Sequence, residues 1–118
     1  MWYLVLSRSL PDQKENKQLH LAEHRKWLED QHRAGRVLFS GPTSDRSYGI
    51  YVVLASSLSD AEKLAAQDPD HVRGIGTMEV LEWNAHRAFR LDGATIADIE
   101  CMAREAKDES ADEYRESK

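Results

Sequence analysis

Five histidines, at positions 20, 24, 32, 71 and 86, are the side chains of this sequence suited to proton transfer near neutral pH. His20 and His24 have the i, i+4 spacing of a metal-ligand pair on a helix. The glutamate that follows the first histidine of a metalloprotease motif is missing, and a third ligand would have to come from elsewhere in the chain. From this pattern we expect no metal site and no cofactor.

His24 is the most informative of the five, because it lies in the middle of an apolar helical stripe. An ionisable ring in such a place costs desolvation free energy unless it gains a partner or a cavity. The ring is therefore either a hydrogen-bonded core histidine, which is the commoner case, or a proton carrier facing a cleft. Asp68 has an equally plain local interpretation as the end of a helix before Pro69.

Other polar positions allow a structural and a functional interpretation. Ser40, Gly41 and Pro42 follow a strand, and they form either a simple turn or a backbone wall at the mouth of a cleft. Arg8, at the end of the first strand, either holds an anionic substrate or is solvated. Cys101 is more typical of a small apolar filler than of a nucleophile, because no cation is placed beside it by the sequence.

The elements that must position these residues alternate in a recognisable order. Apolar runs predict four strands, and two amphipathic segments predict helices, the second opened by a capping box at 59–62. The expected ranges are 2–6 (strand), 17–34 (helix), 36–40 (strand), 48–55 (strand), 59–68 (helix) and 77–83 (strand). This β-α-β-β-α-β order predicts an α+β, ferredoxin-like fold with an antiparallel sheet and both helices on one face.

The sheet face without helices is expected to be apolar. The inference rests on a set of strand residues that, from the sequence, cannot all point to a single helical layer: Val37, Phe39, Tyr51, Val53, Met78 and Val80. An apolar sheet face needs a cover, and a second copy of the chain is the usual one. We therefore expect a homodimer.

The chain divides into three parts. Residues 1–90 form the predicted domain, 91–106 a helical extension whose helix spans 94–106, and 107–118 an acidic tail with almost no apolar side chains. So little buriable surface cannot offset the entropy of ordering, and we expect the tail to be disordered.

Composition narrows the classes of partner. Sixteen basic and 21 acidic residues give a formal net charge of −5, which disfavours nucleic acid as a partner. No apolar window approaches the roughly 20 residues of a membrane span, and we expect no membrane association. With one cysteine and no recognisable signal peptide, we expect a reducing, cytoplasmic location.

Several segments together resemble the YciI-like (YCII-related) family. The helix from His24 to Gly35 feeds a strand ending in Ser40-Gly41-Pro42, the second helix ends in Asp68-Pro69, and the closing strand contains Glu79-Val80 and Trp83. The sequence differs from the common pattern at Asp70-His71, where an aromatic residue is frequent, and in its extension beyond residue 85. The resemblance implies a ferredoxin-like protomer of a dimeric α+β barrel, with an active-site His and Asp at His24 and Asp68.

The resemblance implies a site without fixing a substrate. The leading hypothesis is a cofactor-independent isomerase or lyase acting on a small cyclic or aromatic compound, in which His24 moves a proton and Asp68 orients the imidazole. One alternative is a barrel that binds a small ligand without turnover. Another is an oxygen-using protein of the quinol monooxygenase type.

Overall fold

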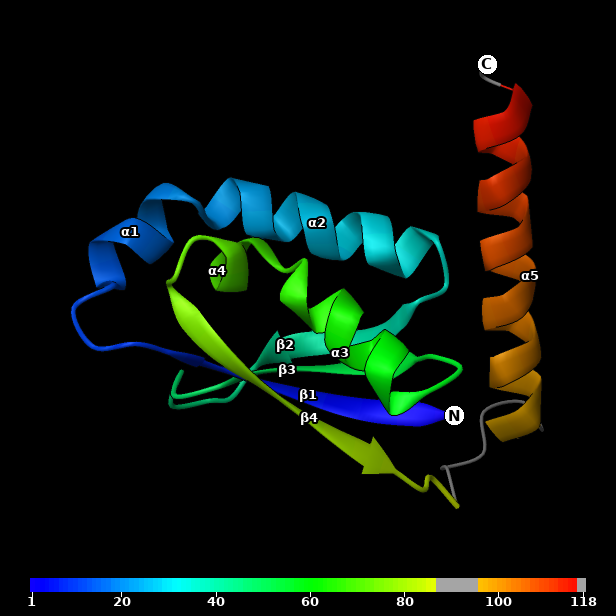
Figure 1. Ribbon diagram of the computed structural model, residues 1–118, viewed down its shortest axis with the longest axis horizontal. Coiled ribbons are helices and arrows are strands. Elements are labelled where there is room, and N and C mark those ends of the chain that lie inside the picture. Colours follow the sequence, from blue (N-terminus) through cyan, green and yellow to red (C-terminus); the bar gives the residue numbers. More distant parts are fainter. Residues whose placement is uncertain (87–95, 117–118) are drawn as a thin grey trace.

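Four strands form one antiparallel sheet in the order β2-β3-β1-β4, shown in the computed structural model, which describes residues 1–86 and 96–116, the last ten by backbone only (Figure 1). Their bounds are β1 Trp2–Ser9, β2 Val37–Pro42, β3 Gly49–Leu54 and β4 Gly76–Trp83. Strands β1 and β3 are central, since β1 pairs with both β3 and β4. The predicted α+β, ferredoxin-like βαββαβ fold is confirmed.

Four helices lie on one face of the sheet: the first predicted helix is divided into two, and the second is followed by a further short one (Figure 1). Their bounds are α1 Lys14–Leu19, α2 Leu21–Arg33, α3 Leu58–Ala66 and α4 Pro69–Val72. The prediction of one helix over 17–34 was wrong. At His20 the backbone leaves the helical region (φ −105°, ψ 15°), so that this residue ends α1 and begins α2.

The predicted start and end of the second helix also need correction. Ser57, not Ser59, is the N-cap of α3: its extended backbone lets the side chain accept a 3.1 Å hydrogen bond from the Asp60 amide. Asp68 does not end a helix. It is the N-cap of α4, with Pro69 at the first helical position, where a missing amide hydrogen costs nothing.

The hydrophobic core lies between the sheet and the helices. Its buried members are Tyr3, Val5, Val37, Tyr51, Val53, Ala61, Leu64 and Ala65, with Trp27, Leu28, Met78 and Val80 packed against them. This corrects the inference from the sequence that these strand residues divide between two faces. Cross-strand register puts Val5, Tyr51 and Val80 side by side on the helix face, while Phe39 is 69% exposed.

The opposite sheet face is nevertheless largely apolar, through the alternate residues of each strand, although Glu79 lies beside Leu6 on it. Cross-strand pairing groups Leu4 with Val52 and Leu81, and Leu6 with Ile50. Helices α1 to α4 all lie on the other side of the sheet (Figure 1). The expectation of an apolar bare face is thus right, although the residues that make it are different ones.

Helix α5, Ile96–Glu116, is the C-terminal extension, and its packing depends on one glycine. Gly35 adopts φ +73°, and a Cβ there would lie 2.1 Å from the Ala103 carbonyl oxygen. The helix continues ten residues past the predicted segment, because Ala, Glu, Lys and Arg favour helix without tertiary contacts. Residues 94–95 lie outside the described part. Within that part, no helix has the length and apolar character needed to cross a membrane.

Candidate functional site

His24 on α2 meets Asp68 at the start of α4, although 44 positions separate them in the sequence. The imidazole Nε2 lies 3.3 Å from each carboxylate oxygen of Asp68. Figure 1 shows why: α4 lies under the first half of α2, close to the start of β4. The expectation that the two side chains lie within hydrogen-bond reach is confirmed.

Asp68 is held rigidly and is completely buried. Its Oδ2 accepts a 3.2 Å hydrogen bond from the Tyr51 hydroxyl of β3. Its Oδ1 accepts a 2.9 Å bond from the backbone amide of Asp70, which is the N-cap interaction of α4. The carboxylate therefore has a fixed orientation toward His24, as a partner that orients an imidazole requires.

A second carboxylate completes the cluster. Asp70 is 4% exposed, and its Oδ2 lies 3.7 Å from Nε2 of His24. Among the described residues this carboxylate accepts no hydrogen bond, and Lys17 adds a further positive charge nearby. His24, Asp68 and Asp70 thus place one imidazole and two buried carboxylates within 4.8 Å of one another.

The surroundings change the proton affinities of the site. Burial alone would lower the pKa of His24, but the hydrogen bond and negative charge of Asp68, helped by Asp70, outweigh burial and raise it above 6.5. Burial raises the pKa of Asp70, with His24 opposing. Burial, then Asp68, raises the pKa of Tyr51 so strongly that its hydroxyl stays a hydrogen-bond donor.

Two further contacts hold α2 over the site. Trp27 packs edge-to-face on Tyr51, with ring centroids 6.1 Å apart. On the outer surface Arg73 reaches back across α4 to Glu23, at 2.8 Å. Both contacts fix the helix that carries His24 relative to the segment that carries Asp68.

The other predicted site residues are not brought into contact with this pair. Ser40, exposed, contacts His32 of α2 at 2.7 Å, although the strand register pairs it with Tyr51. Gly41 and Pro42 do not form the predicted break after β2; they continue the strand as its exposed last residues. Arg8 alternates with Leu6, so it points to the helix-free face, and it covers the Tyr48 ring at 5.1 Å.

Tyr51 and Asp70 are site residues that reasoning from the sequence missed. A signal for Tyr51 existed in its alternation with Val53, which places a hydroxyl on the buried face where it needs a partner. For Asp70 the signal was the N-cap pattern, in which the second residue after a capping Asp lies beside its carboxylate.

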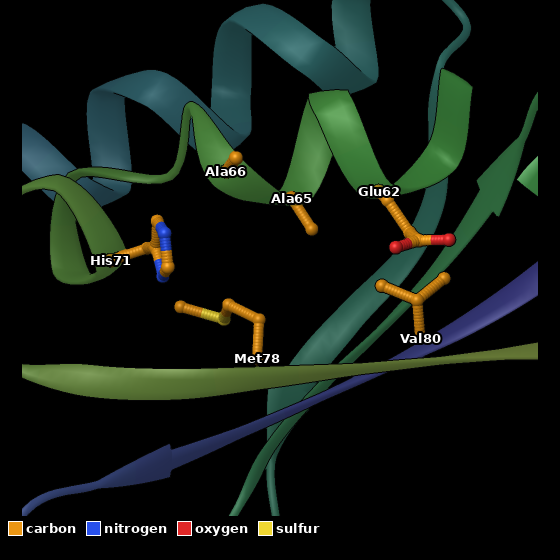
Figure 2. Close-up of a pocket in the computed structure, with 6 residues that line it drawn as sticks. All are labelled: Glu62, Ala65, Ala66, His71, Met78 and Val80. Carbon is orange, nitrogen blue, oxygen red and sulfur yellow. The ribbon is translucent and has the colours of Figure 1, made fainter. Parts of the chain in front are cut away.

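Two hollows flank the site without including either residue of the pair. One, of about 310 Å³, lies between α3, α4 and β4, and Figure 2 shows Glu62 and His71 at its two ends with alanines facing Met78 and Val80. The other, of about 410 Å³, lies between α2 and the α3–α4 connection and is lined in part by Trp27 and Pro69. Pro69 directly follows Asp68, so the second hollow begins next to the site.

Comparison with known proteins agrees with this architecture. The model of the YCII-related domain matches residues 1–84. The chain belongs to the YCII-related family. A YCII-related relative is the uncharacterized protein YjpA of Bacillus subtilis (strain 168), 31% identical over 81 residues that cover 69% of this chain and 94% of the relative.

Among solved structures, the YCII-related chain resembles 5-chloro-2-hydroxyhydroquinone dehydrochlorinase from Burkholderia phenoliruptrix AC1100, determined in complex with 2,5-dihydroxybenzoquinone. The TM-score is 0.62 at 19% identity, and the match covers 73% of this chain and 96% of the dehydrochlorinase. At that identity the likeness concerns the fold. The family resemblance drawn from the sequence is thus confirmed over the part that holds His24 and Asp68.

Proposed function

We propose that this chain is a cofactor-independent enzyme of the isomerase or lyase type, in which His24 transfers a proton and Asp68 orients its ring. The observation that carries the proposal is the 3.3 Å contact between Nε2 of His24 and a fully buried carboxylate. The histidine side chain itself is 20% exposed. A small molecule can therefore approach the ring while both carboxylates stay away from solvent.

The pair suits proton transfer in both directions. A neutral imidazole takes a proton from an acidic C–H or O–H group, and the imidazolium that forms is stabilised by Asp68. In an isomerisation the same proton returns at another atom. In an elimination the electron pair forms a new double bond and the leaving group departs as an anion. Neither reaction needs a second catalytic side chain.

The substrate class that we propose is a small cyclic or aromatic compound, such as a quinol. Support comes from the dehydrochlorinase of the same fold, which was determined with a bound dihydroxybenzoquinone. Ser40, Gly41 and Pro42 remain proposed contacts, since Ser40 is the strand partner of Tyr51. Arg8 remains a proposed contact for an anionic substrate. Because it points to the helix-free face, the substrate-binding cleft would have to extend around the end of the sheet to reach it.

The proposal is tested by incubating the protein with lactones, catechols and chlorinated quinols in D₂O and following proton exchange and product by NMR. Exchange or product formation with at least one class, absent in buffer, supports an enzyme. Ligands that raise the melting temperature without any exchange would identify a binding protein instead. Oxygen consumption with a quinol would indicate a monooxygenase and overturn the proposal.

We also propose that the chain is a homodimer, held by the apolar sheet face that carries Leu4, Val52 and Leu81. Leu81 is 42% exposed, and it lies beside Leu4 on this face. Covering such a face with an identical one removes apolar surface from both copies. The single thiol, Cys101, is free and exposed, which fits our proposal of a reducing, cytoplasmic location.

Leu81→Lys is expected to shift the protein toward monomer, because dimer formation would bury an unpaired ammonium group. Sedimentation velocity at micromolar concentration should show the dissociation constant raised by at least about 100-fold, which corresponds to about 2.7 kcal/mol. Leu19→Lys is the matched control: Leu19 is 77% exposed on α1, away from this face. A wild-type monomer, or equal effects of both variants, would rule out this interface.

A further inference from the structure

We propose that His24, Asp68 and Asp70 also form a binding site for one divalent first-row transition-metal ion, with Zn²⁺ as the representative. This inference goes beyond the proposed proton transfer and does not depend on it: the ion and the Nε2 proton that Asp68 accepts are alternative occupants of the same place. The three side chains come from two segments, α2 and the start of α4, so the fold, and not a local sequence motif, creates the site.

The distances between the donor atoms fit a single ion. Nε2 of His24 lies 3.3 Å from the Asp68 oxygens and 3.7 Å from Oδ2 of Asp70. Two ligands of a tetrahedral ion with bonds of 2.0–2.1 Å lie about 3.3 Å apart. All three ligand atoms lie within 4.8 Å of one another, so modest side-chain adjustment brings them around one centre.

The state of Asp70 is the independent observation that points to a cation. Its carboxylate is nine-tenths buried, and among the described residues it accepts no hydrogen bond; its one close partner is His24 at 3.7 Å. Burial of a carboxylate without hydrogen bonds costs free energy, even though its oxygens keep some contact with solvent and His24 and Lys17 supply positive charge nearby. A cation between Asp70 and its neighbours would remove that cost.

Charge balance favours a doubly positive ion. With a neutral imidazole, the donor set of one nitrogen and two carboxylates carries two negative charges, which a divalent cation neutralises. An imidazole ligand favours zinc and its first-row neighbours over magnesium and calcium, which prefer oxygen donors. Three protein ligands leave a fourth position open on the side where His24 is partly exposed.

The outer contacts of Asp68 are those expected for a ligand. The Tyr51 hydroxyl and the Asp70 amide each donate to one of its oxygens and hold the carboxylate in place. Such outer partners orient metal ligands and strengthen binding. Each oxygen keeps a free lone pair for an ion, since a carboxylate oxygen can accept twice.

Isothermal titration of EDTA-treated, full-length protein with ZnCl₂ tests the site. The expected result is binding of one Zn²⁺ per chain, weakened at least about tenfold in Asp70→Asn and in His24→Asn. His71→Asn and His20→Asn are the matched controls. His71 is exposed and directly follows Asp70, and His20 is the helical neighbour that sequence spacing pairs with His24. Both controls should bind Zn²⁺ like the wild type.

Circular dichroism is used to check that each variant is folded before its titration is interpreted. Asp70→Asn and His24→Asn test the site independently, so one folded variant of the two is enough for the test. No binding of Zn²⁺ by the wild type would overturn the proposal, as would unchanged affinity in both ligand variants. Equal losses in the control variants would also overturn it. The titration measures the heat of Zn²⁺ binding and not activity, so a negative result would not contradict the proposed proton transfer. Conversely, a protein that binds Zn²⁺ but shows no activity would support the metal site and not the proposed function.

Discussion

His24→Asn is expected to lower kcat/KM by about 10²–10⁴-fold for any substrate that the protein turns over, the usual contribution of a positioned acid or base. Asparagine keeps the polarity and approximate volume of histidine but cannot take up a proton. The fold should survive, because the side chain is partly exposed and supplies no cap or core contact that asparagine lacks. The measurement is steady-state kinetics beside a thermal melt.

The pH profile separates a chemical role of His24 from a structural one. If the neutral imidazole is the base, wild-type kcat/KM should rise as pH increases through the pKa of His24, which Asp68 and Asp70 hold above 6.5 against the opposing effect of burial. The residual activity of His24→Asn should lose that step. An unfolded variant would favour a core histidine, and a folded variant with full activity would exclude His24 from the chemistry.

Asp68→Ala is expected to give the largest loss of stability, about 2–4 kcal/mol in urea unfolding. The variant removes the N-cap of α4, worth about 1 kcal/mol, and leaves the buried Tyr51 hydroxyl without its acceptor, at about 1–3 kcal/mol. His24 loses its partner as well. No other single side chain of the cluster holds three groups at once.

A double variant identifies the cause of that loss. Adding Tyr51→Phe to Asp68→Ala removes the hydroxyl that has lost its acceptor. The double variant should therefore lose less free energy of unfolding than the sum of the losses in the two single variants. Asp30→Ala, at an exposed ion pair with Lys26, is the control and should change stability by less than about 0.5 kcal/mol. Additive losses, or a control as harmful as Asp68→Ala, would contradict the network.

The fold was largely predictable from the sequence because each strand has a clear apolar run and each connection a turn signal. The division of the strand residues between the two faces of the sheet was not predictable. Tyr51, Val53 and Val80 all fit under one helical layer, since the cross-strand register aligns them and the small alanines of α3 let the helix approach closely. Register and the depth of a helical layer are tertiary properties that alternation alone does not encode.

The site was predictable only in part, and for a related reason. The pairing of His24 with Asp68 came from a family resemblance, because local sequence favours a core histidine and a helix-ending aspartate. Tyr51 and Asp70 belong to the same cluster only after α4 is folded under α2. Asp68 begins α4 instead of ending α3, which turns its carboxylate toward two donors and the imidazole at once.

A crystal structure of the protein soaked with 2,5-dihydroxybenzoquinone tests the central claim most directly. The account predicts that the ligand lies with an oxygen within about 3.2 Å of Nδ1 of His24, the ring nitrogen that does not face Asp68, while Asp68 keeps its bonds to Nε2 and Tyr51. Occupancy of the hollow between Glu62 and His71, with His24 turned away from every ligand atom, would contradict it.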